Sequence, residues 1–144
     1  MNQKTTNELL KILNSADTVS ELEDFTKIAD QYTSIHTFSE YIDDCLDKCG
    51  MSQSQLIQNA QIQRNYGYQI LNGTKNPGRD KVISLCLALS LPLAEVQRAL
   101  TLAKEAILYP KNKRDSVLIF CINKHLSVLD TNDLLFQVKE KLLN

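Results

Sequence analysis

Apolar residues recur along this chain at the three- and four-residue spacing of amphipathic helices, and no sustained run alternates apolar with polar positions as strands do. Four glycines and three prolines leave few interruptions in a chain whose apolar fraction is 43%. We therefore expect an all-α fold. The pattern predicts helices over residues 5–15, 18–32, 37–50, 52–61, 63–71, 80–89, 92–107, 115–125 and 131–142.

Short sequence signals mark where several of these helices begin and end. Capping boxes open at Thr18, Thr37 and Ser52, each followed three residues later by Glu or Gln. Thr131 is expected to cap the last helix. Gly73 lacks a Cβ atom, so it suits the left-handed conformation that ends a helix.

The helices group into three parts. A chain of 144 residues is long enough for one ordinary hydrophobic core, or for a small core and an accessory helical unit, and we do not expect two full domains. We expect an N-terminal helical extension in residues 1–36, a five-helix helix-turn-helix domain in residues 37–108, and a C-terminal helical extension in residues 109–144 that packs on this core. The helix of residues 80–89 is apolar nearly all round, which predicts a central position. No signal peptide or bilayer-spanning run is visible, so we expect a cytoplasmic protein.

Charge is distributed unevenly along the chain. The net charge is −1, which by itself argues against a nucleic-acid-binding protein. Residues 1–50 carry four lysines against ten acids, whereas residues 51–144 carry twelve Lys or Arg against seven acids. Within residues 61–81, Asp80 is the one acid among the cations Arg64, Lys75, Arg79 and Lys81. The resulting local charge of +3 can neutralise a few phosphates.

The four cysteines and two histidines form no recognisable catalytic or metal-binding pattern. Cys86 and Cys121 lie in apolar runs, so we expect them to be buried as small hydrophobic residues. Cys45 and Cys49 are four residues apart, which fits neither a zinc knuckle nor a redox Cys-x-x-Cys motif, and metal or redox use is the minor alternative. No Gly-rich phosphate loop or His-Glu-x-x-His motif is present. We expect neither an enzyme nor a bound cofactor or metal.

Residues 52–79 predict two short helices joined by a tight turn, the layout of a helix-turn-helix. The residues expected to turn inward are Leu56, Ile57, Ala60, Ile62, Tyr66 and Ile70. The outer face of the second helix, residues 63–71, then carries Arg64, Asn65, Tyr68 and Gln69. Arg and Asn or Gln can make paired hydrogen bonds to guanine and adenine edges, so this face suits base reading. An ordinary solvated helix face is the alternative.

A set of residues spread over this region matches a known pattern. The set comprises Ser52, Gln53, Leu56, Ile57, Ala60, Ile62, Ile70, Asn72-Gly73-Thr74-Lys75, Pro77 and Ala88-Leu89-Ser90-Leu91-Pro92-Leu93. With it, residues 38–107 resemble the XRE family, the lambda-repressor-like helix-turn-helix regulators. The resemblance covers about half of the chain.

The resemblance implies a five-helix DNA-binding domain whose third helix enters the major groove. It implies base contacts for Arg64, Asn65 and Gln69, to which Tyr68 adds a base or sugar contact. It also implies phosphate contacts, for which the candidates are Gln53, Asn72, Thr74 and Lys75. Arg79 and Lys81 join the phosphate-contacting set on charge and position alone.

Three residues depart from the pattern of this family, and one of them is Leu71, which replaces a frequent glutamate. Gln61 stands at the turn where glycine is usual, which predicts a wider or strained turn. Gly67 stands where the family usually buries an aliphatic side chain, which predicts a gap filled by the flanking tyrosines or Leu71. A glycine inside a helix also costs about 1 kcal/mol relative to alanine.

We predict a sequence-specific transcriptional regulator that places residues 63–71 in the major groove of double-stranded DNA. Because the local charge is modest, two copies acting on two half-sites would bind far better than one, and we expect a homodimer. The alternative is a protein-interaction adaptor in signalling that kept the fold and does not bind DNA. Residues 1–35 and 109–144 favour it, since a minimal DNA-binding unit does not need their helices.

Overall fold

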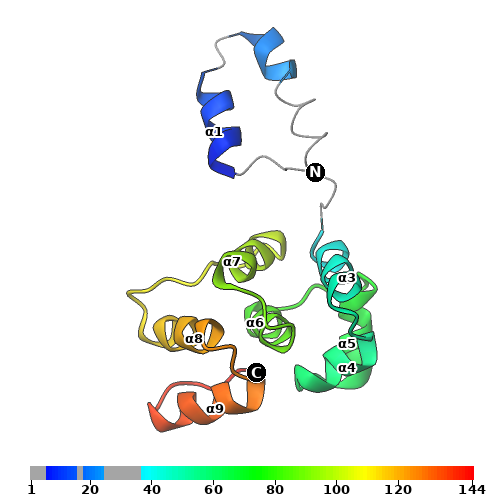
Figure 1. The fold of residues 1–144 in the computed structure, drawn as a ribbon, viewed down its shortest axis with the longest axis vertical. Coiled ribbons are helices and arrows are strands. Elements are labelled where there is room, and N and C mark those ends of the chain that lie inside the picture. Colours follow the sequence, from blue (N-terminus) through cyan, green and yellow to red (C-terminus); the bar gives the residue numbers. More distant parts are fainter. Residues whose placement is uncertain (1–5, 16–17, 25–36) are drawn as a thin grey trace. The chain divides into compact units, whose positions relative to one another are not determined.

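The structure, a computed structural model, describes residues 6–15, 18–24 and 37–144, and the regular elements in those ranges are all helices. By the contacts within it, the chain divides into two compact units, residues 1–36 and 37–144 (Figure 1). Residues 19–24 are helical. The other helices are α1 (Thr6–Asn14), α3 (Phe38–Cys49), α4 (Gln53–Asn59), α5 (Arg64–Leu71), α6 (Arg79–Ala88), α7 (Leu93–Leu102), α8 (Lys113–Asn123) and α9 (Val128–Gln137).

In the first unit, side-chain hydrogen bonds lie at two helix ends. The hydroxyl of Thr18 accepts a hydrogen bond from the backbone N–H of Glu21 at 3.1 Å, which confirms the predicted cap. The hydroxyl of Ser15 donates to the carbonyl of Ile12 at 2.7 Å, just beyond α1. The predicted helix over residues 18–32 lies outside the described residues after residue 24.

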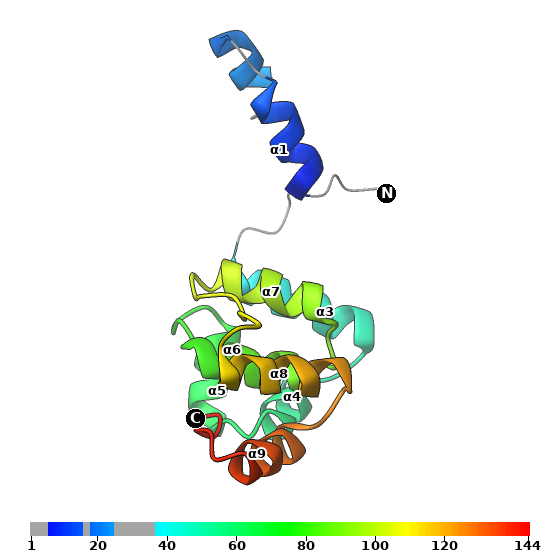
Figure 2. The same cartoon turned by 90° about the vertical axis from the view of Figure 1, so that its left-hand side faces the viewer.

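The second unit is built around α6, which confirms the central position predicted for this helix. Its residues 82–87 are all buried, and α6 packs against α4, α7 and α9 (Figures 1 and 2). Helix α8 packs against α7. A helix that is apolar all round needs neighbours on every side, and here helices from both ends of the unit provide them.

Three pairs of helices in this unit meet at corners of one geometry: α4 with α5, α6 with α7, and α8 with α9. At each corner a non-glycine residue adopts a left-handed conformation, with φ 59° at Gln61, 53° at Ser90 and 54° at His125. The backbone N–H of the following residue then bonds to a carbonyl five residues back, at 3.0–3.2 Å. This is the Schellman closure of a helix C-terminus. The segments that begin at Leu89 and Leu126 both read Leu-Ser within two residues of such a corner.

Helix α7 ends earlier than predicted. Lys104 adopts φ 60° and the N–H of Glu105 bonds to the carbonyl of Leu100, which closes the helix after Leu102. Ile107, expected to continue the apolar stripe, is 52% exposed. Leu108 is buried instead, and its backbone N–H and carbonyl both bond to the side chain of Gln97.

Helices α8 and α9 also begin earlier than predicted. The side chain of Asn112 caps α8 by accepting from the N–H of Asp115, so Lys113 and Arg114 belong to its first turn rather than to a loop. Ser127 caps α9 in the same way, which makes the prediction of Thr131 as the cap wrong. Thr131 lies inside α9 with 0% of its surface exposed.

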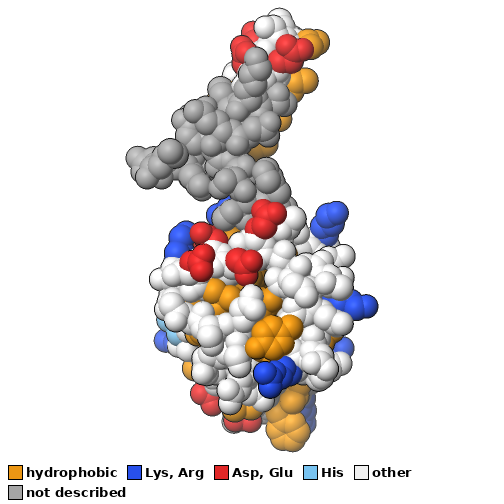
Figure 3. Space-filling model, turned by 90° about the vertical axis from the view of Figure 1, so that its right-hand side faces the viewer, with side chains coloured by type: hydrophobic (Ala, Val, Ile, Leu, Met, Phe, Trp, Pro, Cys, Tyr) orange, Lys and Arg blue, Asp and Glu red, His pale blue; other side chains and the backbone are white. Residues whose placement is uncertain are grey.

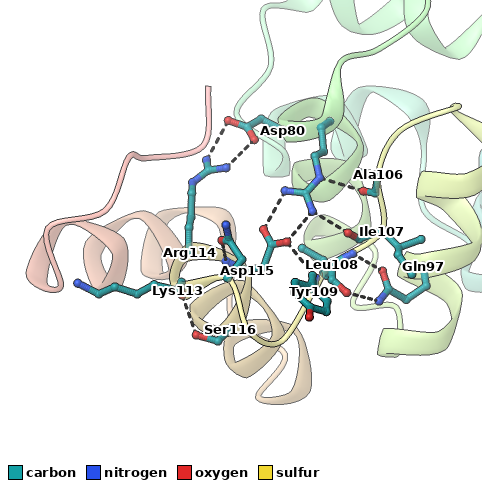
Figure 4. A network of polar contacts seen from close by, with 12 residues as sticks. Asp80, Gln97, Ala106, Ile107, Leu108, Tyr109, Lys113, Arg114, Asp115 and Ser116 are labelled. Atoms are coloured by element: carbon teal, nitrogen blue, oxygen red, sulfur yellow. Dashed lines mark hydrogen bonds and ion pairs between the residues drawn. The ribbon is translucent and has the colours of Figure 1, made fainter.

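Two Arg-Asp dipeptides join the start of α6 to the start of α8 (Figure 4). Arg79 makes two hydrogen bonds of 2.8 Å to the carboxylate of Asp115, and Arg114 makes two of 2.9 and 3.0 Å to that of Asp80. Paired bonds of this kind fix both the distance and the orientation of their partners. We refer to these four side chains as the Arg–Asp clasp.

The clasp also holds the last residues of the chain. The guanidinium of Arg114 donates to the carbonyls of Lys141 and Leu142 at 2.9 and 3.1 Å. The N–H of Asn144 donates to the carboxylate of Asp80 at 3.2 Å. The segment that follows α9 is therefore fixed against the start of α6.

Candidate nucleic-acid interface

The candidate interface is the corner formed by α4 and α5. Ser52 caps α4 by accepting from the N–H of Gln55 at 3.1 Å, as predicted. The side-chain amide of Gln55 donates to the side-chain oxygen of Asn59 at 2.9 Å, one turn further along α4. The side-chain oxygen of Gln63 caps α5 by accepting from the N–H of Tyr66 at 2.7 Å.

Gln61 adopts the left-handed conformation that a glycine would take more easily. Its φ is 59°, and its side-chain amide donates to the carbonyl of Gln58 at 3.1 Å. That carbonyl also accepts from the backbone N–H of Gln61 at 3.1 Å, so the side chain adds a second bond to the last turn of α4. The left-handed conformation makes the turn strained, as predicted.

The gap predicted at Gly67 does not exist. A Cβ atom added to Gly67 would lie 2.7 Å from Cγ2 and 2.8 Å from Cγ1 of Ile57, which is closer than carbon atoms can approach. Ile57 of α4 fills the space, and neither the flanking tyrosines nor Leu71 is needed for it. Gly67 therefore allows α5 to lie unusually close to α4.

The four residues predicted to contact bases lie on one face of α5, because positions 64, 65, 68 and 69 are neighbours on a helix. Arg64 and Asn65 are exposed, and Tyr68 and Gln69 are partly buried. The guanidinium of Arg64 lies over the ring of Tyr68, 5.9 Å from its centroid. Tyr66, expected to turn inward, is also only partly buried, whereas Ile62 and Ile70 are buried.

The residues predicted to contact phosphates lie at three places. Gln53 is exposed at the start of α4, and Lys81 is partly buried in α6. Asn72, Thr74 and Lys75 are exposed just after α5. The side chain of Asn72 accepts from the N–H of Thr74 at 2.9 Å, and the N–H of Lys75 bonds to a carbonyl of α5 at 3.1 Å. These bonds fix Thr74 and Lys75 to the end of α5.

Arg79 does not belong to the phosphate-contacting set. In addition to its bonds to Asp115, it donates to the carbonyls of Ala106 and Ile107 at 2.9 and 3.0 Å. Its side chain is 23% exposed, and that of Asp115 is 7% exposed. The hydrogen bonds from the guanidinium of Arg79 hold the pKa of Asp115 below its usual range. Through its bonds to a buried carboxylate and two carbonyls, Arg79 stabilises the fold.

Within the described part of the chain, three of the predicted cations make no ion pair: Arg64, Lys75 and Lys81. Asp115 neutralises Arg79, and Arg114 neutralises Asp80. The local charge of residues 61–81 therefore remains +3, and it comes from the three unpaired cations. Figure 3 shows the face over α3, α4 and α5, where acidic side chains gather at one edge, toward α3, and basic ones lie elsewhere on it. The exposed acids of α3 include Asp43 and Asp47.

Sequence reasoning missed two features of this region. Glutamine is not a favoured capping residue, so no signal pointed to Gln63. The clasp had a signal in the repeated Arg-Asp dipeptides at Arg79 and Arg114, but the pairing joins residues 34–36 positions apart and needs the fold to be known.

Three of the four cysteines are at least partly buried, and Cys49 is exposed. Cys86 is fully buried, as predicted, and burial raises the pKa of its thiol. Cys121 is buried as well, and the pKa of Cys45 is raised by its partial burial. No group of three or more potential metal ligands occurs among the residues that the structure describes. No helix in these ranges is long and apolar enough to cross a bilayer.

Comparisons of the chain with protein-family models, with curated proteins and with solved structures found no match. The functional argument therefore rests on the residues and geometry of this chain.

Proposed function

We propose that this protein is a sequence-specific, non-enzymatic DNA-binding regulator of the cytoplasm that inserts α5 into the major groove. Residues 37–108 would form a five-helix, lambda-repressor-like domain, and residues 109–144 would extend it. The observation that carries the proposal is the outward row Arg64, Asn65, Tyr68 and Gln69 on a helix held against α4 by the contact between Gly67 and Ile57. A helix with this polar row has the dimensions and donors that a major groove accepts.

In this proposal α5 makes the base contacts, and residues at both ends of the corner make the phosphate contacts. Arg64 would bond to guanine, and Asn65 or Gln69 to adenine. Gln53, at the start of α4, would meet one backbone strand, and Asn72, Thr74 and Lys75, after α5, would meet phosphates at the other end. Lys81 adds charge at the edge. Phosphate contacts at both ends would fix the register of α5 in the groove.

A homodimer is part of the proposal. Three cations near the corner can release only a few counterions from DNA, so a single copy would bind weakly at physiological salt. Two copies on two half-sites raise the affinity without new contacts on either copy.

A second candidate, an adaptor that does not bind DNA, is favoured by one observation. Helix α3, which packs against α5, exposes Asp43 and Asp47, and these acids would repel a phosphate backbone on that side. In this case the same face, or the terminal helices, would receive a signalling protein.

Selection of bound sequences from random duplexes by the full chain tests the proposal. We expect one enriched motif, and a loss of about 2–4 kcal/mol of binding free energy to that motif in Arg64→Ala with Gln69→Ala. The matched control is Lys111→Ala with Gln137→Ala, which removes one cation and one amide at exposed positions outside the corner. Absence of any enriched motif, or equal affinity of the Arg64/Gln69 variant, would favour the adaptor.

A further inference from the structure

The side chains of Arg64 and Tyr68 form a cation–π pair on the outer face of α5. They are four residues apart, and the guanidinium carbon lies 5.9 Å from the ring centroid. The other arginines of the described residues are occupied differently. Arg79 and Arg114 bond to carboxylates, and Arg98 lies over the ring of Tyr41.

Contact with an aromatic ring uses none of the hydrogen-bond donors of a guanidinium, which point outward in its plane. No ion pair within the described residues uses those of Arg64. The contact with Tyr68 therefore restricts the position of this side chain and leaves its paired donors for an acceptor pair such as O6 and N7 of guanine.

Coplanarity with guanine determines what the tyrosine ring meets. A guanidinium that makes paired bonds to guanine lies in the plane of that base pair. Because the centroid of the Tyr68 ring lies 5.9 Å from the guanidinium carbon, the ring can then reach the level of the adjacent base pair, which is about 3.4 Å along the duplex axis. The major-groove edge of that pair offers one apolar group, the C5 methyl of thymine.

We propose that Arg64 and Tyr68 act as one reading unit for a guanine next to a thymine, in which Arg64 bonds to the guanine and the Tyr68 ring contacts the thymine methyl. This inference rests on the proposed DNA-binding function and names the base step that α5 selects. Tyr68 is then a specificity-determining residue rather than an additional sugar contact.

The test removes single atoms from the DNA and leaves the protein intact. The full chain first selects its motif from random duplexes, and affinities are then measured by fluorescence anisotropy on that motif. Replacing the thymine beside the guanine by deoxyuridine removes only the methyl group, and we expect affinity to fall about fourfold. Replacing the guanine by 7-deazaguanine removes the N7 acceptor, and we expect a fall of about tenfold or more.

Protein variants assign these effects to the two side chains. Tyr68→Phe keeps the ring and should retain the response to deoxyuridine, whereas Tyr68→Leu should bind both duplexes equally. Arg64→Met keeps an extended side chain, loses the N–H donors and should no longer distinguish 7-deazaguanine from guanine. A circular dichroism spectrum equal to that of the parent chain confirms the fold of each variant.

The outcomes separate this inference from the proposed function. A selected motif that lacks a guanine beside a thymine, or equal affinity for thymine and deoxyuridine, would overturn the reading unit and leave DNA binding standing. Failure to bind any duplex at low salt would overturn both.

Discussion

At the scale of single residues, the close contact between Gly67 and Ile57 sets how α5 lies on α4. Alanine at position 67 would gain about 1 kcal/mol of helix propensity. It would also place a methyl group 2.7 Å from Cγ2 of a side chain that is only 3% exposed. Overpacking of a buried site costs about 1–3 kcal/mol, so we expect Gly67→Ala to lower the free energy of unfolding by about 1 kcal/mol in urea titrations.

A double-mutant cycle isolates the contact as the cause. Ile57→Ala removes both γ carbons that the added methyl group would meet. In that background, Gly67→Ala should become stabilising, because only its gain in helix propensity and the filled space remain. The same destabilisation in both backgrounds would mean that the close approach of α5 to α4 is not what requires glycine.

Asp115 makes the free energy of unfolding depend on pH in the acidic range. Its pKa is held below the usual value in the folded state, chiefly by the hydrogen bonds from Arg79. The stability that it contributes is therefore complete above the unfolded-state pKa of about 3.9 and is lost as the pH falls through the lower folded-state pKa. We expect Asp115→Asn to lower the free energy of unfolding by about 2 kcal/mol at pH 7, because Arg79 loses its charged partner.

The variant should also respond differently to pH. Between about pH 4 and pH 2, the free energy of unfolding of Asp115→Asn should fall less steeply than that of the parent chain. Asp133→Asn is the control, since Asp133 is exposed on α9 and should leave the acid dependence nearly unchanged. Parallel curves for Asp115→Asn and the parent would contradict the assignment of the acid-sensitive bond.

At the scale of elements, several helices end in a left-handed residue that is not glycine. Gln61, Ser90, Lys104, His125 and Lys139 all have φ between 53° and 63°, a region that costs L-residues about 1 kcal/mol or more. Lys104→Gly should therefore raise the free energy of unfolding by about 0.5–1 kcal/mol, measured by urea titration.

The neighbouring residue provides a control for that substitution. Ala103 has φ −80°, a conformation that alanine adopts freely. Ala103→Gly should lower the free energy of unfolding by about 1 kcal/mol, because glycine only adds freedom to the unfolded chain there. The prediction for Lys104 fails if the two glycine substitutions shift stability in the same direction.

The sequence predicted the start of a helix correctly where a local side chain caps it. Thr37 and Ser52 cap their helices as predicted, because such a bond joins residues three apart. The start of α9 was misplaced because Ser127 and Thr131 are both acceptable caps, and only burial of Thr131 in the core distinguishes them. The end of α7 was misplaced because Leu108 takes the buried position that Ile107 was expected to fill.

At the scale of the whole molecule, α8 and α9 complete the core. They bring Leu118, Ile122 and Leu135, each at most 2% exposed, against the central helices. A fragment of residues 37–108 would expose the surface that they cover and leave Arg79 without Asp115. We expect it to unfold at a lower temperature than a fragment of residues 37–144, with a broad transition and increased binding of a hydrophobic dye. Equal melting temperatures would contradict a single shared core.

The sequence predicted only part of the candidate site. A feature was predictable where it depends on residues that are close together in the sequence. The row from Arg64 to Gln69 was predictable, since helical spacing alone puts it on one face. Arg79 was misassigned because its partner, Asp115, lies 36 residues away. The role of Gly67 was missed because it depends on the packing of α5 against Ile57.

Salt dependence of binding to generic duplex DNA tests the central proposal most directly. Each phosphate contact contributes about −0.9 to the slope of log affinity against log salt, so three cations predict a slope of about −3 per protomer. Lys75→Ala should reduce the magnitude of this slope by about 1, and Lys111→Ala should leave it unchanged. A flat response, or no binding at low salt, would contradict the account of α5 as a DNA-reading helix.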